Sequence, residues 1–263
     1  MMLLFAIVFF IFGTIIGSFL NVLVLRYNTG LSIVSGRSQC FVCGKTLRWY
    51  ELVPLFSFIF LGGRCASCKS RISWQYPTVE AATGALFVLS FLKFGISPAT
   101  MLYLCVSSIL VAVSVYDFKH KIIPDGMVFL FDAAALLFFF LSHTGVASAV
   151  LAAPDFWAGP ILFAFFAFFW LVSGGKWMGL GDAKLSLGVG WCLGLSGGVF
   201  AIMLAFWIGA AVSLFLLGLE RLNLSRFRLT MKSEVPFAPF IIVAFFLTLF
   251  SGWNLSLIMN FAR

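Results

Sequence analysis

Two aspartates stand at the ends of strongly apolar segments, where they could carry out acid–base chemistry. Asp117 ends one such segment, and Asp182 opens another within residues 179–182, which read Gly-Leu-Gly-Asp. Two carboxylates held together share a proton over a working pH range. The charged one can then accept a proton from an attacking water, and the protonated one can donate to a developing oxyanion or leaving amine. The plainer alternative is that each aspartate only caps a helix or pairs with a nearby lysine.

Three other carboxylates lie in or beside apolar segments. Asp125 follows a proline at the start of a segment, which favours a helix N-cap. Asp132 lies on the same helix face two turns further in, where we expect a buried, hydrogen-bonded group, with a catalytic role as the alternative. Glu80 begins another segment, where a carboxylate is electrostatically favoured. The remaining acidic residues are expected to be solvated charges: Glu51, Asp155, Glu220 and Glu234.

Four cysteines form two Cys-x-x-Cys pairs, Cys40 with Cys43 and Cys65 with Cys68. This pattern is typical of a tetrahedral zinc site with four thiolate ligands. Because four thiolates leave no open position for water, the zinc would be structural and would carry much of the folding free energy of a short polar segment. Two disulfides, a redox pair and unligated thiols are the alternatives.

The elements that position these residues must lie in a membrane. The chain of 263 residues is 62% hydrophobic and 10% charged, whereas soluble domains are about 25% charged. A membrane-spanning helix needs about 20 mostly apolar residues. Eight such segments are predicted, with seven as the fallback if the short sixth merges with the seventh across a turn at Leu195–Gly198. They are residues 3–25, 78–95, 98–116, 127–143, 156–173, 184–195, 198–219 and 237–259. The first is expected to be a retained helix, not a cleaved signal peptide. Two further cysteines inside these segments, Cys105 and Cys192, are expected to be small buried hydrophobes.

The net charge of +8 follows from topology and does not indicate nucleic-acid binding. With eight spans, alternate loops fall on one side, and those loops carry nearly all the lysines and arginines; only Lys93 and Arg263 fall on the other side. The positive-inside rule places the basic loops in the cytoplasm and both termini outside. The basic side would also contact anionic membrane lipid. We therefore predict an all-α, multi-pass protein in three parts: a first transmembrane helix (1–25), a cytoplasmic zinc module (26–77) and a multi-helix catalytic core (78–263).

Several short motifs follow one another along nearly the whole chain: Gly17–Val22, the two cysteine pairs, Arg71–Ser73, Tyr76–Glu80, Asp117, Ile123–Asp125, Gly179–Leu185 and Pro236–Phe240. In these motifs the chain resembles the prepilin peptidase (type IV leader peptidase) family of Gly-x-Gly-Asp aspartic proteases.

This resemblance implies Asp117 and Asp182 as the catalytic pair, in the inner membrane of a bacterium. The substrates would be prepilins or pseudopilins of type IV pilus and type II secretion systems, cut before their hydrophobic stretch. Many members with a four-cysteine loop also methylate the new N-terminus with S-adenosylmethionine, so that co-substrate is expected as well. Two rivals remain. One is a Gly-x-Gly-Asp protease of the presenilin kind, whose Pro-Ala-Leu element is absent here. The other is a non-enzymatic scaffold or transporter with a zinc-ribbon docking loop.

Overall fold

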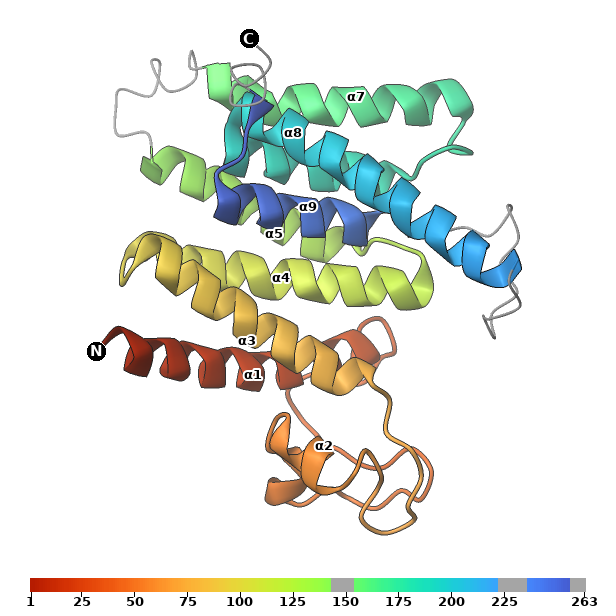
Figure 1. The fold of residues 1–263 in the computed structure, drawn as a ribbon. Helices are drawn as coiled ribbons and strands as arrows, with labels where there is room; N and C mark the ends of the chain where they lie inside the picture. The colour runs from red at the N-terminus through yellow and green to blue at the C-terminus, as the bar shows by residue number, and fades with distance from the viewer. Residues whose placement is uncertain (143–153, 222–235, 256–263) are drawn as a thin grey trace. The chain divides into compact units, whose positions relative to one another are not determined.

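The computed structural model describes residues 1–142, 154–221 and 236–255, in which helices are joined by loops and no extended strand occurs. Figure 1 shows the order of the elements along the chain. The bounds are α1 (Met2–Arg26), η1 (Trp49–Leu52), α2 (Phe56–Phe60), α3 (Gln75–Phe94), α4 (Pro98–His120), α5 (Asp125–Ser142), η2 (Pro154–Trp157), α7 (Ala158–Ser173), α8 (Leu180–Arg221) and α9 (Ala238–Ser251).

Six of the described helical stretches are long and apolar enough to cross a membrane, which confirms a multi-pass membrane protein. They are α1, α3, α4, α5, η2 with α7, and α8; the helix α9 is also apolar but shorter. The count of eight spans stays a prediction. The basic loop expected at 220–236 lies almost wholly outside the described residues, as does the end of the last predicted span.

The helix α8 is broken within its length. It contains 42 residues, and Gly194 within it has non-helical angles (φ 68°, ψ 179°). A Cβ atom at Gly194 would meet Asp155 Oδ1 at 2.7 Å, and the backbone N–H of Leu195 donates to the same oxygen at 3.3 Å. The break therefore precedes the turn expected at Leu195–Gly198. Asp155 is exposed, as expected, but it also accepts this hydrogen bond at the start of the second half of α8.

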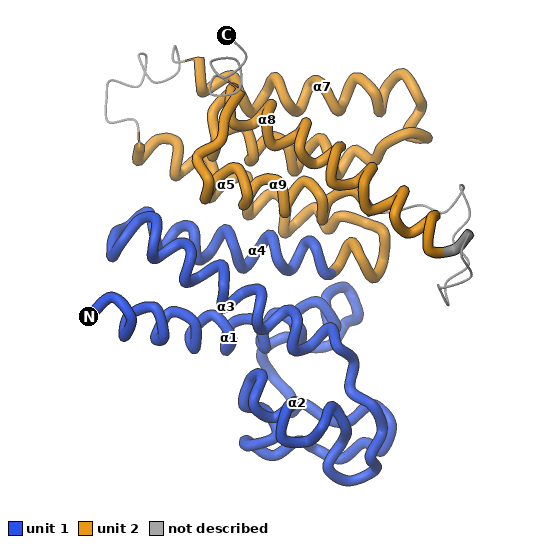
Figure 2. Tube along the Cα trace, in the orientation of Figure 1, with its two compact units in different colours: residues 1–115 blue, residues 116–263 orange. Residues whose placement is uncertain are grey.

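The chain divides into two compact units, residues 1–115 and 116–263 (Figure 2). In the first unit, α1 and α3 pack closely through small residues. A Cβ atom on Gly13 would lie 2.7 Å from Gly84 Cα, and one on Gly17 would lie 2.7 Å from Glu80 Cα. One turn further along α1, Asn21 Nδ2 donates to the carbonyl of Tyr76 at 3.3 Å. Such small-residue contacts are a common way for membrane helices to associate, and here they make an antiparallel pair.

The second unit is organised around α8, which packs against α5, α7 and α9. Close approach again depends on glycine, because a Cβ atom at Gly190 would lie 2.6 Å from Gly159 Cα in α7. Large aromatic side chains fill the spaces, and Phe131, Phe166 and Phe245 are completely buried. This packing gives the N-terminal ends of α8 and α9 defined positions within the unit.

Candidate active site and metal site

Both candidate catalytic aspartates belong to the second unit and lie at helix ends. Asp117 is in the last turn of α4, and Asp182 is in the first turn of α8. Their exposed fractions are only 4% and 7%. The structure brings the two side chains close enough for their carboxylates to interact electrostatically. Residues 65 positions apart in the chain thus share one site.

Local backbone geometry holds Asp182 in this place. Its N–H donates to the carbonyl of Gly179 at 3.2 Å, which forms the first turn of α8. Gly181 packs on the segment between α4 and α5: a Cβ atom there would lie 2.7 Å from Ile123 Cβ. By contrast, a Cβ atom on Gly179 would make only ordinary contacts, at 3.7 Å with Asp182 Oδ2 and 3.9 Å with the backbone N of Gly181. Gly181 is therefore the glycine whose lack of a side chain lets α8 approach Asp117.

Asp117 faces the start of a third helix. The backbone N–H of Ala238, the first residue of α9, interacts with its carboxylate. The first N–H groups of a helix have no partner within that helix and carry a partial positive charge, so they stabilise an anion. Ala238 is completely buried, which fits a close approach of α9 to the carboxylate.

Neither aspartate is neutralised by a lysine within the described residues. Lys184, the lysine nearest to Asp182 in sequence, pairs with Asp125 at 2.7 Å. The Oδ1 atom of Asp182 is buried and has no hydrogen-bond partner among the described residues. A buried carboxylate oxygen without a partner is costly, and such atoms cluster where a water or substrate is to be bound. The alternative of simple lysine pairing is not what the structure shows.

The two remaining aspartates of this region have different surroundings. Asp125 is the first residue of α5, and its partner is Lys184. Asp132 is buried and its carboxylate interacts with the backbone N–H of Gly188, as expected, although its Oδ1 has no partner in the described part of the chain. A Cβ atom on Gly188 would lie 2.7 Å from that oxygen. Asp182 and Gly188 are six positions apart on α8 and lie on different faces of the helix, so Asp132 does not lie on the same face of α8 as Asp182.

The four cysteines of the two Cys-x-x-Cys pairs converge, with all four Sγ atoms within 4.8 Å of one another. The two pairs have the same backbone turn: Gly44 N–H donates to the Cys40 carbonyl at 2.9 Å, and Lys69 N–H donates to the Cys65 carbonyl at 3.1 Å. The turns end in left-handed residues, Gly44 at φ 68° and Lys69 at φ 58°. Glycine adopts this conformation without strain.

The sulfur geometry fits a tetrahedral metal ion. With metal–sulfur bonds of about 2.3 Å, the sulfurs of such a site lie about 3.8 Å apart. The Sγ atoms of Cys40 and Cys68 are 3.8 Å apart. Backbone N–H groups of Cys43 and Val42 lower the pKa of Cys40 to about 6, and the Ser70 hydroxyl and N–H lower the pKa of Cys68. Thiolates, which are the form that binds metal, are thereby favoured at Cys40 and Cys68, whereas desolvation and the neighbouring thiols raise the pKa of Cys43 to about 11.

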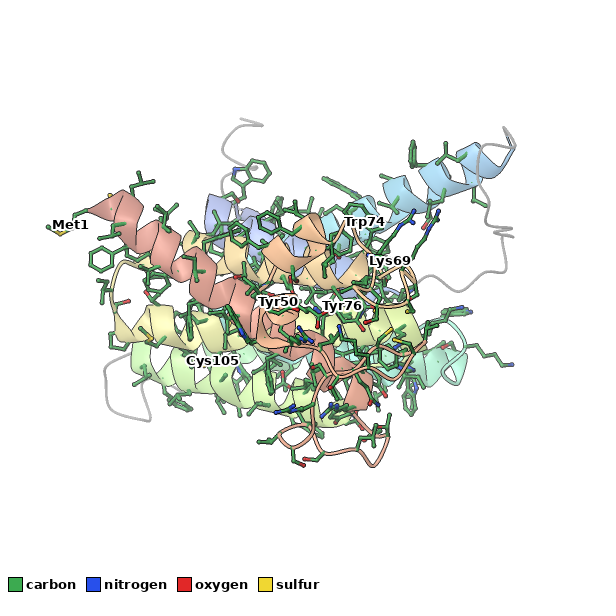
Figure 3. The ribbon with its side chains drawn as sticks, turned by 90° about the horizontal axis from the view of Figure 1, so that it is seen from below. Met1, Tyr50, Lys69, Trp74, Tyr76 and Cys105 are labelled. Atoms are coloured by element: carbon green, nitrogen blue, oxygen red, sulfur yellow. The ribbon has the colours of Figure 1, made fainter. Side chains whose placement is uncertain are left out.

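The cysteines form no disulfide in the structure. Cys192 is partly buried on α8, whereas Cys105 is exposed on the surface of α4 (Figure 3), so the expectation of a buried Cys105 is wrong. In a membrane-spanning helix an exposed small apolar side chain can face lipid, so burial by protein is not needed.

Sequence reasoning missed two glutamates that hold the four-Cys module, residues 27–74, in shape. Glu51 was expected to be solvated, but it is buried: it accepts the N–H of Arg48 at 2.7 Å and pairs with Lys45 at 3.1 Å. These contacts keep the pKa of Glu51 below its usual range, mainly through the Arg48 N–H. Glu80, at the start of α3, accepts the N–H of Leu55 at 2.8 Å. The reciprocal spacing of Arg48 and Glu51 resembles a helix capping box and could have signalled the first contact. The hydrogen bond between Leu55 and Glu80 joins residues that are distant in sequence and has no such signal.

Comparison with known proteins identifies the family. A model of the bacterial peptidase A24 N-terminal domain matches residues 11–94, and a model of the type IV leader peptidase family matches residues 104–214, which include both aspartates.

Full-length relatives agree with these family models. A protein of Bacillus subtilis (strain 168) is 34% identical over 242 residues, covering 88% of each chain. One of Burkholderia pseudomallei (strain 1026b) is 31% identical over 287 residues, covering 99% of this chain and 89% of the relative. One of Myxococcus xanthus is 42% identical over 124 residues, covering 47% of this chain and 37% of the relative. All three are named prepilin leader peptidase/N-methyltransferase. No solved structure matches the chain. Matched along both halves and by relatives of similar length, the chain belongs to the type IV leader peptidase family.

Proposed function

We propose that this protein is a membrane aspartic endopeptidase that removes the leader peptide of type IV prepilins or pseudopilins, with Asp117 and Asp182 as its catalytic pair. The observation that carries the proposal is the meeting of two buried carboxylates that interact with each other and have no cationic partner among the described residues. The names of the relatives, prepilin leader peptidase/N-methyltransferase, support the substrate class.

The proposed reaction uses the two aspartates as a base and an acid. One carboxylate, ionised, takes a proton from a water as the water oxygen attacks the scissile carbonyl carbon. The other, protonated, donates its proton to the carbonyl oxygen and so stabilises the tetrahedral intermediate. Collapse of the intermediate breaks the C–N bond, and the proton held by the first aspartate goes to the leaving amine. The backbone N–H at the start of α9 orients the carboxylate of Asp117, and the unpartnered Oδ1 of Asp182 is free to bind water or substrate.

The metal site is proposed to hold zinc in a structural role. Cys40, Cys43, Cys65 and Cys68 would be its four ligands, and the ion would supply folding free energy to the module. The protein would then consist of a first transmembrane helix (1–25), the cytoplasmic zinc module (26–77) and the catalytic core (78–263). The catalytic step uses no metal.

Methylation of the new N-terminal residue is proposed as a second activity, because the relatives' names include N-methyltransferase. The methyl group of S-adenosylmethionine would pass to the free amine, leaving S-adenosylhomocysteine. Such a transfer needs little acid–base help beyond loss of the amine proton, so no residue type in the described part singles out its site.

We further propose that the protein lies in the bacterial inner membrane, with its active site and module on the cytoplasmic side and both termini outside. The basic residues of the predicted cytoplasmic loops support this orientation. The break at Gly194 supports eight spans, since it divides α8 into two apolar segments. Membrane lipid and a prepilin are the expected partners.

The test is leader cleavage by Asp117→Asn and Asp182→Asn variants in lipid nanodiscs, with labelled S-adenosylmethionine present. Each variant should lose cleavage, because asparagine cannot exchange the required proton, while membrane insertion and zinc content stay normal. Asp125→Asn is the matched control: it removes a charge at the same end of the unit but from an exposed residue paired with Lys184, and it should cleave normally.

Near-normal cleavage by either variant would overturn the catalytic assignment. Loss of cleavage in Asp132→Asn with retention in the other two would move the site to α5. Cleavage by the unmodified protein without incorporation of label would limit the protein to peptidase activity.

A further inference from the structure

The short helix α2 carries an exposed apolar face in the four-Cys module. Phe56, Ile59 and Phe60 follow the spacing of one helical face and are 61%, 72% and 85% exposed. Phe58 points elsewhere, and its ring lies 4.9 Å from the ring of Trp74. Three large apolar side chains gathered on one turn of helix are unusual on a surface that meets only water.

Contacts within the first unit place this face beside α3, not beyond its end. The N–H of Leu55, immediately before α2, donates to Glu80 Oε2 at 2.8 Å. Glu80 is the sixth residue of α3, so at 1.5 Å per residue it lies about 7.5 Å along the helix from Gln75. The ring pair of Phe58 and Trp74 makes a second attachment at the beginning of the same helix. Since α3 is a membrane-spanning helix by length and composition, α2 lies at the depth of its first turns.

The backbone indicates that this attachment is specific. Leu55 has φ 61° and ψ −51°, a conformation that is costly for a residue with a side chain and that persists where surrounding contacts hold it. Here the contact is the hydrogen bond to Glu80, whose side chain is buried against α1, where Gly17 lies next to Glu80 Cα. The position of α2 is therefore set by the packed pair of membrane helices.

The charge of the module complements a membrane surface. Its basic residues are Arg37, Lys45, Arg48, Arg64, Lys69 and Arg71. Its only acidic residue, Glu51, is buried and paired with Lys45. Trp49 and Trp74 are 79% and 72% exposed, and tryptophan is enriched where membrane and water meet. Figure 3 views the first unit from the module's side, with Lys69 and Trp74 labelled on the module and Met1 at the opposite end of α1.

We propose that α2 is an interfacial anchor. Phe56, Ile59 and Phe60 would insert into the boundary between headgroups and acyl chains of the adjacent leaflet, and the basic residues of the module would contact anionic headgroups. Interfacial helices insert to a depth of about 5–10 Å, which agrees with the position of α2 along α3. The occupant of the apolar face is phospholipid. This inference is independent of the catalytic assignment, because it involves neither aspartate.

The test uses the full-length protein in nanodiscs that contain phosphatidylglycerol. A photo-crosslinking phenylalanine analogue, benzoylphenylalanine, replaces Phe60 in one variant and Phe58 in another, and adducts are identified by mass spectrometry. Position 60 should yield mainly phospholipid adducts. Position 58, on the same helix but against Trp74, is the matched control and should yield crosslinks within the chain. Lipid adducts should decrease when phosphatidylcholine replaces phosphatidylglycerol.

A third variant tests whether lipid labelling depends on the apolar face of α2 and not on the probe itself. With the probe at position 56, replacing both Ile59 and Phe60 by serine should abolish the lipid adduct while zinc content is unchanged. Absence of lipid adducts at position 60, or equal labelling at 58 and 60, would overturn the proposal. Crosslinks from position 60 to added prepilin or to a second copy of the chain, in place of lipid, would overturn it as well. Equal adduct yields in both lipids would refute the role given to the basic residues.

Discussion

Gly181→Ala is expected to impair catalysis by displacing Asp182. The added Cβ atom would lie 2.7 Å from Ile123 Cβ and 3.0 Å from Ile123 Cδ1. Carbon atoms in contact prefer about 3.5–4.0 Å, so α8 or the Ile123 segment must move by about 1 Å. A displacement of about 1 Å can cost about 100-fold in rate, and overpacking costs about 1–3 kcal/mol of stability. We therefore expect roughly a 100-fold lower kcat for leader cleavage, with the variant still folded.

Gly179→Ala is the matched control, because its Cβ would make only ordinary contacts, the nearest at 3.7 Å with Asp182 Oδ2. Its cleavage rate should stay within a few-fold of the unmodified protein. The assay is the initial rate of leader cleavage in nanodiscs, together with thermal unfolding of each variant. Adding Ile123→Ala should not rescue Gly181→Ala, since alanine keeps the obstructing Cβ, whereas Ile123→Gly should restore part of the rate. Full activity of Gly181→Ala, or a larger loss in Gly179→Ala, would refute the steric reasoning.

Three further predictions concern the four-Cys module and its attachment. Glu51→Gln should destabilise the module by about 1–3 kcal/mol by weakening the contacts to Lys45 and the backbone. Because the folded-state pKa of Glu51 is lowered, the stabilisation by its carboxylate is fully present above about pH 4.3 and is lost as the pH falls through the folded-state pKa. The difference in unfolding free energy between the unmodified protein and Glu51→Gln should therefore shrink below about pH 4.3. A difference that stays constant with pH in chemical unfolding would contradict this. Chelating the metal should make residues 27–74 sensitive to protease while the membrane helices keep their circular dichroism, and a module that stays resistant would argue against metal-dependent folding. Gly17→Leu should lower the thermal unfolding temperature by forcing α1 away from the Glu80 backbone. Gly218→Leu, with open space around its Cβ, should leave that temperature unchanged. Equal effects would show that α1 and α3 are not tightly packed at Gly17.

The parts of the fold that depend on composition and local spacing could be predicted from sequence. Membrane helices follow from long apolar runs, and the convergence of the cysteines follows from two Cys-x-x-Cys turns of the same kind. The turn predicted at Leu195–Gly198 was off by one position, because the break at Gly194 depends on a hydrogen bond from Leu195 to Asp155, which lies 40 residues away.

Features that depend on tertiary neighbours could not be predicted. The hydrogen bond between Leu55 and Glu80 arises from how the module folds against α3 and leaves no local pattern in the sequence, whereas the contact of Glu51 with Arg48 has the spacing of a capping box. The pairing of Asp117 with Asp182 could be expected from the resemblance, but the role of Gly181 in permitting it depends on a contact with Ile123 that no local pattern predicts.

The contact of Asn21 with Tyr76 has a consequence for metal affinity. It joins the end of α1 to the start of α3, so the membrane helices hold together the two ends of the segment that contains the module. Bringing together the ends of a free segment of about 50 residues costs about 3.5 kcal/mol of chain entropy. The packed hairpin of α1 and α3 holds the ends of the segment together without metal, so metal binding does not have to offset that entropy. The same segment cut out of the protein should therefore bind its metal a few hundred-fold more weakly, although every ligand is present. The hairpin of α1 and α3 thus acts on the module as a cross-link would, and the ion binds to a loop that is already closed.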